Sequence, residues 1–510
     1  MRAVILSSEE RTDIGLLFSQ DNTSDHLLTF IFVMYKTFIF PICFLALPFI
    51  GIAQKDPDKP LFPMGLPSEP DMLYESFDIK AKLTNDNYRD VGGSASVKKW
   101  APTPKSQGQY GTCAAWATGF CARTILEAQK NGWTDKAEID KNVFAYGFIY
   151  RVTSNNPSCW GAFTSECVKN MKEIGIPKLS EYSVHCPSSI PKEIYTYATK
   201  YKIKGYAKLW DEWDKTTGKQ KVDLMKKSLS EGNPVVISMI CPNSFHYPNG
   251  DVWIPKESAK DNPNNPHGRH AMCVVGYDDE KHGGAFEIQN SWGETWGNKG
   301  YIWVKYEDFV AFVYQAMELI HFDTNLNQNT EVVLSGAVRY VRDDKMEMKA
   351  NLVSNKTYKM DMAYKSGTRF RLYISNNEPA FVYAFGSDLT NRTYQVFPYA
   401  PNVSPALTYK QNDVPIPSED KHIRMDGTVG TDYLCVLYSK DPLDLEAIRQ
   451  RIEAAGSRYT FRQKVEMAIG PKLMKDSEIT YTKNDGKMSF TAKAKGKSCV
   501  AMIVEMEHVD

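Results

Sequence analysis

One cysteine in the stretch SQGQYGTCAAWATG has surroundings that suit a nucleophile. Cys113 follows a glycine-containing approach and directly precedes a run of small, helix-forming residues. Its sulfur would lie near the N-terminus of that helix, where the partial positive charge favours the thiolate. A thiolate that attacks a carbonyl also needs a base and hydrogen-bond donors for the oxyanion. A thiol buried only for packing needs neither, so the rest of the chain decides between these two interpretations.

Two later segments supply such partners. In GRHAMCVVGYDD, His270 begins an apolar, β-branched run and is followed by Ala271, whose small side chain leaves room for a sulfur. In IQNSWGETWG, Asn290 ends a second predicted strand. Its amide oxygen would accept the ring N–H of His270 and fix the tautomer. Trp292 would cover that hydrogen bond and exclude water.

The three segments together resemble those of papain-like cysteine peptidases, over roughly residues 90–310. Gln107 lies six residues before Cys113, and His270 lies 157 residues after it. Asn290 follows 20 residues after His270. The resemblance implies that Cys113 attacks a peptide carbonyl, that His270 protonates the leaving amine and then activates water, and that Asn290 orients His270. It also implies an oxyanion hole made by the Gln107 side chain and the Cys113 backbone N–H, with no cofactor or metal.

The same resemblance assigns residues that would contact a peptide substrate. Trp160 and Gly161 match the edge that pairs with the substrate backbone. Ser238 and Arg269 would line the pocket for the second residue before the scissile bond, and Trp292 would border the cleft. A cation at that pocket wall favours acidic or polar substrate side chains.

Two positions depart from the family pattern. Ala114 stands directly after the nucleophile, where the family usually has Trp, and Tyr110 stands three residues before it, where the family usually has Cys. These changes alter the packing below the nucleophile but remove none of the chemical groups. Two alternative functions stay open: a catalytically inactive binding protein on the peptidase scaffold, and a transpeptidase that passes the same acyl-enzyme to an amine.

Composition restricts the class of protein. The chain has 510 residues, of which 42% are hydrophobic and 24% charged, and its formal net charge is zero. This length predicts two or three domains. The even charge balance argues against a nucleic-acid partner. The resemblance to papain-like peptidases implies a protein or peptide substrate, and the oligomeric state stays open.

The N-terminal residues 1–53 are predicted to be a targeting region. Met34 opens a segment with a basic residue, an apolar run and small residues up to Ala53. This pattern is typical of a cleaved signal peptide over 34–53, with residues 1–33 as an upstream extension. The apolar run of about 16 residues is short of the roughly 20 that span a membrane. We expect a secreted, periplasmic or cell-surface protein of the bacterial type.

The remaining chain divides by composition and pattern. Residues 54–85 are rich in proline and charge and are predicted to be a linker or short pro-segment. Residues 86–322 predict an α+β, papain-like fold with a helical lobe and a β-barrel-like lobe. Residues 331–510 predict a separate β-rich, β-sandwich-like accessory domain. Part of it, 364–441, resembles an uncharacterised domain appended to bacterial peptidases and kinases, which favours a cell-surface or protein partner.

Local patterns add three expectations. Alternating residues on both sides of Asn376 predict a β-hairpin. The stretch LDLEAIRQRIEAAG has helical spacing of its apolar residues and stops at Gly456. Ten cysteines together with an export signal permit disulfides. The closely spaced Cys159, Cys167 and Cys186 allow one bridge, whose pairing the sequence leaves open.

Overall fold

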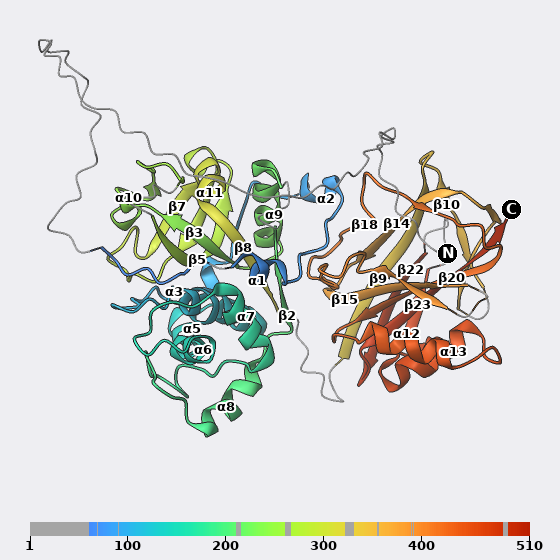
Figure 1. Cartoon of the computed structure of the whole chain (residues 1–510), viewed down its shortest axis with the longest axis horizontal. Coiled ribbons are helices and arrows are strands. Elements are labelled where there is room, and N and C mark those ends of the chain that lie inside the picture. The colour runs from blue at the N-terminus through green and yellow to red at the C-terminus, as the bar shows by residue number, and fades with distance from the viewer. Residues whose placement is uncertain are drawn as a thin grey trace, which may run out of the picture. The chain divides into compact units, whose positions relative to one another are not determined.

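Figure 1 shows the computed structural model of the chain. It describes residues 61–68, 70–89, 91–210, 216–260, 267–321, 331–353, 356–388, 390, 392–482 and 488–510. The predicted signal peptide and its upstream extension lie outside the described residues. The described residues fall within one compact unit. Among them, no helix has the length and apolar character needed to cross a membrane.

A helical lobe is built around the segment that starts at Cys113. This segment runs as α3 (Cys113–Ala115), a π-helical stretch (Trp116–Arg123) and α4 (Thr124–Asn131). It ends at Gly132, whose φ of 67° makes it a left-handed C-cap. Small side chains recur along it because all its residues from 113 to 128 are buried. The other helices of this lobe are α5 (Lys136–Lys141), α6 (Tyr146–Thr153), α7 (Thr164–Glu173) and α8 (Lys192–Ala198).

The second lobe is an eight-stranded sheet in the order β2-β8-β3-β5-β6-β7-β4, with β1 paired to β5. Its strands are β1 (Ser94–Ser96), β2 (Gly205–Lys208), β3 (Val235–Cys241), β4 (Val252–Trp253), β5 (Gly268–Asp278), β6 (Ala285–Gln289), β7 (Tyr301–Lys305) and β8 (Val313–Ile320). Three helices accompany it: α9 (Gly218–Ser230), α10 (Asn243–His246) and α11 (Tyr306–Phe312). The predicted strands of this region are present, and β5 pairs antiparallel with both β3 and β6.

Strand β5 separates two hydrophobic cores. Ala271, Cys273 and Val275 belong to the core shared with the helical lobe. Met272 and Val274 belong to the core of the sheet lobe. Successive side chains of a strand point to opposite faces, so one strand serves both lobes. His270 therefore lies at the start of the strand on which the two lobes meet.

The β-rich part, residues 331–510, contains two further sheets. One has the order β18-β14-β9-β22-β21, with β10 and β19 attached, and the other has the order β11-β12-β23-β20-β15-β16, with β13 and β17 attached. The strands of the first are β9 (Glu331–Arg342), β10 (Glu347–Met348), β14 (Arg369–Asn376), β18 (Val414–Ile416), β19 (Ile423–Arg424), β21 (Ile479–Tyr481) and β22 (Met488–Lys495). Those of the second are β11 (Ala350–Leu352), β12 (Tyr358–Met360), β13 (Tyr364–Lys365), β15 (Ala380–Ser387), β16 (Thr393–Phe397), β17 (Ala406–Leu407), β20 (Gly430–Ser439) and β23 (Cys499–Val509).

The predicted hairpin around Asn376 is wrong. β14 pairs with β9, β18 and β19, whereas β15 pairs with β16, β17 and β20, so the two strands lie in different sheets. Side chains of both sheets share one core. A turn between two alternating segments indicates a reversal of direction, but long-range partners decide whether the strands pair with one another or cross between sheets.

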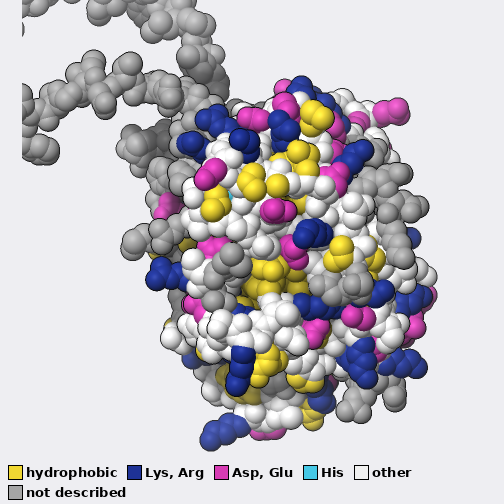
Figure 2. All heavy atoms as spheres, turned by 90° about the vertical axis from the view of Figure 1, so that its right-hand side faces the viewer, with side chains coloured by type: hydrophobic (Ala, Val, Ile, Leu, Met, Phe, Trp, Pro, Cys, Tyr) yellow, Lys and Arg dark blue, Asp and Glu magenta, His cyan; other side chains and the backbone are white. Residues whose placement is uncertain are grey.

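Two helices cover one face of the second sheet of the β-rich part (Figure 1). They are α12 (Leu445–Ala454), which lies within the predicted helix, and α13 (Phe461–Ile469). Their apolar residues pack on Phe381, Tyr383 and Phe385 of β15. This explains why every residue of β15 is buried, while β14 alternates. Figure 2 shows a surface on which basic, acidic and hydrophobic side chains are intermixed.

A segment ahead of the helical lobe packs against that lobe and against the β-rich part. It includes α1 (Asp71–Glu75) and α2 (Asn85–Arg89). Tyr74 and Phe77 belong to the core of the helical lobe. Ala81 and Leu83 belong to the core of the β-rich part. The remaining short elements are 3-10 turns: Lys98–Trp100, Thr199–Tyr201, Lys281–Gly283, Gly470–Lys472 and Asp476–Glu478.

Candidate active site

Cys113 is the first residue of α3 and is completely buried. Burial raises the pKa of its thiol, and the backbone N–H groups of Ala271, Gly65, Ala114 and Cys113 itself act on the sulfur in the opposite sense. Ala271 directly follows His270 in β5. The fold thus brings the start of α3 against the start of β5, although their residues are far apart in the chain.

His270 is held by Asn290, which follows β6. His270 Nε2 lies 2.7 Å from Asn290 Oδ1, so the ring donates its Nε2 proton to the amide oxygen. The Asn290 backbone N–H donates to the Gly300 carbonyl at 3.0 Å, which anchors the asparagine. Trp292 stacks on the His270 ring with centroids 4.5 Å apart. The neutral ring therefore carries its proton on Nε2 and leaves Nδ1 as the basic nitrogen.

The Nδ1 atom of His270 is buried and has no hydrogen-bond partner among the described residues. The Cys113 thiol contacts the backbone of Ala271, which directly follows His270. The thiol is not hydrogen-bonded to the His270 ring. Burial raises the pKa of the Cys113 thiol above its ordinary value. Burial also lowers the pKa of His270 to about 3. Both shifts favour a neutral thiol and a neutral imidazole, rather than the thiolate that the helix N-terminus alone predicts, because desolvation outweighs the partial charge of the helix.

The Gln107 side chain is oriented by Ser291. Gln107 Oε1 accepts a hydrogen bond from Ser291 Oγ at 2.6 Å, and the Gln107 backbone N–H donates to the Ser291 carbonyl at 2.8 Å. The amide nitrogen then points the other way, and it donates to the carbonyls of Tyr110 at 2.7 Å and Pro63 at 3.3 Å. Ser291 is the serine of the predicted N-S-W-G motif, and the sequence did not indicate this role.

Residues 61–67, here called the covering segment, lie across these side chains. The Pro63 carbonyl accepts hydrogen bonds from Gln107 Nε2 and from Trp292 Nε1, the latter at 3.1 Å. The Leu66 N–H donates to the Arg269 carbonyl at 3.4 Å. The covering segment thereby occupies the groups that the sequence analysis assigns to the oxyanion hole and to substrate binding.

The covering segment approaches the chain beside the nucleophile so closely that it needs glycine. A Cβ added at Gly65 would lie 2.1 Å from the Gly111 carbonyl oxygen. A Cβ added at Gly111 would lie 2.9 Å from Gly65 Cα. Both distances are shorter than Cβ contacts in proteins, so the two backbones contact each other directly only because both residues lack a side chain.

Aromatic contacts fix the other end of the covering segment. The Phe62 ring stacks on Trp292 with centroids 4.9 Å apart, and the Phe62 N–H donates to His246 Nδ1 at 3.0 Å. His246 lies in α10, is fully buried and stacks on Trp292 as well. Burial lowers the pKa of His246 to about 4. No local pattern indicates a role for this histidine, because the role exists only when the covering segment is in place.

The predicted substrate-binding residues lie at different depths. The Trp160 side chain is 52% exposed, and Gly161, with φ of 94°, faces the Gly65 carbonyl and Pro67. A cavity of about 360 Å³ borders this edge and the covering segment. Ser238 is fully buried, and its hydroxyl lies 3.4 Å from that of Thr164.

One disulfide stabilises the edge formed by Trp160 and Gly161. Cys159 is bonded to Cys186, with Cα atoms 5.8 Å apart. The Gly111 N–H donates to the Cys159 carbonyl at 2.9 Å, and the Gly161 N–H donates to the Gly111 carbonyl at 3.0 Å. The bridge therefore holds the strand-like contact between Trp160 and the approach to Cys113. Cys113, Cys121, Cys241, Cys273, Cys435 and Cys499 are free thiols.

A serine–histidine–aspartate set in the β-rich part is not arranged for nucleophilic catalysis. His508 Nε2 lies 3.0 Å from Ser366 Oγ, and His508 Nδ1 lies 3.3 Å from Asp432 Oδ2. The backbone N–H groups at this turn all donate to carbonyls, those of residues 366, 367 and 368 to residues 509, 425 and 365. None of these amides is free to bind an oxyanion, so the set links strands. Among the described residues, no cluster of side chains suits a metal ion.

The fold and the site define the class of a papain-like cysteine peptidase. Residues 95–316 match the family model of the papain family cysteine proteases. Residues 363–442 match a domain of unknown function, DUF4384. The chain thus carries a papain-family cysteine peptidase domain and a separate C-terminal DUF4384 domain, which confirms the family and the α+β fold class predicted from the sequence.

Two curated proteins illustrate this similarity. Cathepsin K of Mus musculus is 28% identical over 208 residues, which cover 40% of this chain and 56% of that protein. Cysteine proteinase 3 of Entamoeba histolytica is 26% identical over 200 residues, covering 39% of this chain and 57% of that protein. The chain therefore spans little more than half the length of either relative. Among solved structures, xylellain, a cysteine protease from Xylella fastidiosa, aligns at 21% identity and a TM-score of 0.40, covering 52% of this chain and 98% of that one.

Acidic pH is expected to loosen the covering segment. His246 accepts the Phe62 N–H only while Nδ1 is unprotonated, and its pKa is about 4 in the covered site against an ordinary value of 6.5. Departure of the covering segment exposes Nδ1 to water, which raises the pKa from about 4 toward its ordinary value. The uncovered form therefore takes up a proton more readily, and covering weakens as the pH falls toward 4. We expect protection of the Phe62, Gly65 and Leu66 amides against hydrogen exchange to fall about 10-fold between pH 7 and pH 5, after correction for intrinsic rates.

The His246→Asn variant is the matched control, because asparagine offers an acceptor that does not titrate. Its protection should change less over the same pH range, with a remainder contributed by His270. Equal pH dependence in this variant and in the unaltered chain would contradict the role assigned to His246.

Proposed function

We propose that this chain is an exported cysteine peptidase that hydrolyses peptide bonds with Cys113, His270, Asn290 and Gln107. The observation that carries the proposal is the 2.7 Å hydrogen bond from His270 Nε2 to Asn290 Oδ1. It leaves the basic Nδ1 atom on the residue whose neighbour, Ala271, contacts the Cys113 sulfur. A histidine used only for packing would not need a fixed tautomer with its second nitrogen bare.

The proposed reaction has two halves. The Cys113 thiol gives its proton to His270 Nδ1, and the sulfur attacks the peptide carbonyl carbon. The oxyanion is bound by Gln107 Nε2 and the Cys113 backbone N–H. His270 passes the proton to the leaving amine, which breaks the C–N bond and leaves an acyl-enzyme. His270 then removes a proton from water, and the hydroxide attacks the acyl carbon. The C–S bond breaks, the acid product leaves, and the sulfur takes the proton back from His270.

In this proposal the covered site is a resting state. The covering segment uses the same donors that would bind substrate, and its burial of Cys113 and His270 keeps both groups neutral. Substrate binding therefore requires that residues 61–67 leave the cleft. Once water returns, the desolvation of both groups falls, so the helix N-terminus and the imidazole are able to favour the thiolate.

Peptides and proteins are the proposed substrates, and an extracytoplasmic location is the proposed setting. The Cys159–Cys186 bridge supports an oxidising compartment, in line with the signal peptide expected at 34–53. Arg269 offers its carbonyl to the backbone of the covering segment, and we propose the same contact with the substrate backbone. Its side chain at the pocket wall would favour acidic or polar substrate residues.

Labelling by an epoxide-type thiol inhibitor tests the nucleophile. We expect the chain, after a protease cut introduced at residues 68–70, to be labelled on Cys113 and to cleave a peptide library. The Cys113→Ala variant should lose both properties, while Cys435→Ala, which removes a buried thiol of the β-rich part, should keep them. If the cut chain were neither labelled nor able to cleave peptides under reducing conditions, the inactive-scaffold interpretation would replace this one.

The Ser291→Ala variant tests the orientation of Gln107. Without the hydroxyl, Gln107 Oε1 loses its 2.6 Å donor and the amide is free to rotate away from the oxyanion. We expect kcat to fall by about 10- to 100-fold. This fall should not exceed the fall in kcat caused by removing an oxyanion donor itself. Ser291→Thr keeps a hydroxyl and should recover most of the rate. A kcat unchanged in Ser291→Ala would show that Gln107 is positioned without Ser291.

A further inference from the structure

We propose that the β-rich C-terminal part acts as a clamp on the N-terminal segment, so that it controls access to Cys113. The inference rests on the proposed function, because it concerns the regulation of that peptidase site. The clamped stretch is residues 78–84, here called the tether, which follows the covering segment and α1. Its contacts divide between the peptidase domain and the β-rich part.

The tether backbone pairs with both parts in alternation. On the peptidase side, the Lys208 N–H of β2 donates to the Asp78 carbonyl at 2.9 Å, and the Lys80 N–H donates to the Lys208 carbonyl at 3.0 Å. On the other side, the Ile79 N–H donates to the Asn402 carbonyl at 2.7 Å, and the Ser404 N–H donates to the Ile79 carbonyl at 2.8 Å. The tether therefore lies like a strand between the peptidase domain and the β-rich part. A displacement of either part would break hydrogen bonds of the tether.

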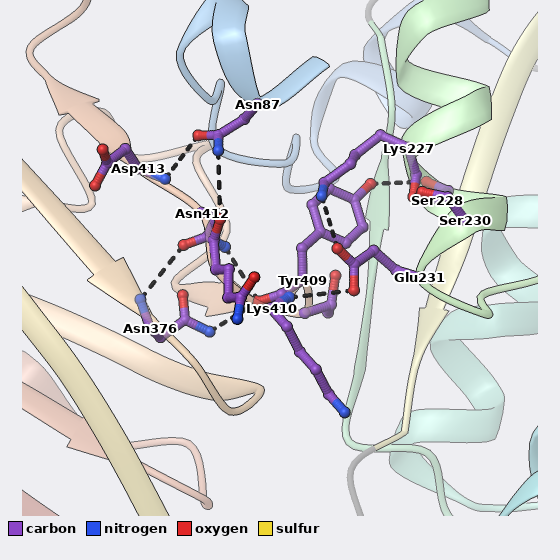
Figure 3. Close-up of polar contacts among 12 residues, drawn as sticks. Asn87, Lys227, Ser228, Ser230, Glu231, Asn376, Tyr409, Lys410, Asn412 and Asp413 are labelled. Carbon is purple, nitrogen blue, oxygen red and sulfur yellow. Dashed lines mark hydrogen bonds and ion pairs between the residues drawn. The ribbon is translucent and has the colours of Figure 1, made fainter. Parts of the chain in front are cut away.

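The end of the tether is hydrogen-bonded to the β-rich part. The Thr84 N–H donates to the Asp413 carbonyl at 3.0 Å. Asn87, in α2, accepts the Asp413 N–H at 2.7 Å and donates to the Gln411 carbonyl at 3.3 Å, as Figure 3 shows for Asp413. Leu83 is 5% exposed within the core of the β-rich part. The β-rich part thus buries the Leu83 side chain and also provides hydrogen-bond partners for the end of the tether.

A buried ion pair lies at the centre of the clamp. Lys80 Nζ lies 2.8 Å from both carboxylate oxygens of Glu318 in β8, and the two side chains are 5% and 0% exposed. Thr408 Oγ1 donates to the same carboxylate at 2.8 Å from the β-rich part, and Ser228 Oγ donates at 2.8 Å from α9. Tyr409 joins Ser228 at 2.7 Å (Figure 3). Removing one partner of such a pair leaves a buried charge unpaired. Separating the tether from the peptidase domain or from the β-rich part is therefore costly.

Lys208 connects the clamp to the cleft. Its backbone pairs with the tether, and its buried ammonium group donates to the Tyr74 carbonyl at 3.1 Å and the Glu75 carbonyl at 3.2 Å, at the end of α1. The Tyr74 hydroxyl donates to the Trp210 carbonyl at 3.0 Å. Only a short stretch separates Pro67 from α1, so fixing α1 raises the effective concentration of the covering segment at the cleft. Loosening the clamp lowers this effective concentration, so the covering segment leaves the cleft more often.

One flank of the tether has room for movement. A cavity of about 500 Å³ borders Ile79, Lys80 and Leu83 on one side and Tyr399 and Pro417 on the other. A tether packed on all sides would need the cores to rearrange before it moved. Here the clamp can open toward the cavity, and the covering segment can then leave Cys113.

The experiment measures how fast an epoxide-type thiol probe labels Cys113 in the full chain. Lys80→Met removes the ammonium group while the hydroxyls of Ser228 and Thr408 continue to serve Glu318. Thr84→Pro removes the N–H that donates to Asp413 and leaves every charge in place. We expect each variant to be labelled about 5- to 150-fold faster than the unaltered chain, the range of a typical coupling between sites.

Lys98→Met is the matched control. It breaks another lysine–glutamate pair of the peptidase domain, Lys98 Nζ to Glu287 Oε1 at 2.5 Å, which does not involve the tether. Its labelling rate should equal that of the unaltered chain. Each protein is also cut at residues 68–70 to free the covering segment, after which all should be labelled at one fast rate within about two-fold. That agreement shows that the variants are folded at the peptidase site.

The outcomes separate the two proposals. If the cut chain is labelled rapidly but both tether variants are labelled as slowly as the unaltered chain before the cut, the clamp is refuted and the peptidase stands. If no cut chain is labelled, the proposed function fails. If Lys98→Met is accelerated as much as the tether variants, the effect is general destabilisation and the clamp is again refuted.

Discussion

The arrangement of the site depends on one hydrogen bond, from His270 Nε2 to Asn290 Oδ1. It determines which ring nitrogen is basic, and it exists only because β5 pairs with β6 and the chain then turns back at Asn290. The pairing of β5 with β3 on its other edge anchors His270 against the sheet, while Ala271 faces the helical lobe and the start of α3. The two hydrophobic cores on either side of β5 therefore hold His270 at the start of this strand and Ala271 against the Cys113 sulfur.

Desolvation is the second physical influence on this site. The helix N-terminus stabilises a thiolate at Cys113, but the covering segment excludes water from both the thiol and the imidazole, and burial raises the pKa of one and lowers that of the other. An ion pair between them would have to form without solvent. The covered site is consequently neutral, and the close approach of Gly65 to Gly111 is part of this covering.

The N-terminal segment has more than one structural role along its length. Its first residues fill the cleft, α1 and Phe77 complete the core of the helical lobe, and Ala81 and Leu83 complete the core of the β-rich part. A segment that contributes to two cores is held more firmly than its own few hydrogen bonds would hold it. The buried Lys80–Glu318 pair adds specificity, since any other register of the tether would leave Glu318 without its cation.

The sequence by itself determined the class of chemistry and the family, because Gln107, Cys113, His270 and Asn290 stand in an order and spacing that few other arrangements share. It also determined the strands that carry His270 and precede Asn290, and α12, since these follow from local patterns of apolar residues and from the stop at Gly456. The tertiary structure alone decided that β14 and β15 enter different sheets, that Cys159 pairs with Cys186, and that Ser291 and His246 contact Gln107 and Phe62. Each of these depends on which distant segment arrives at a given place, and no local pattern of side chains carries that information. The covering of Cys113 by residues 61–67 is the clearest case, because a short proline-rich stretch has no periodicity of its own and takes its conformation from the cleft it fills.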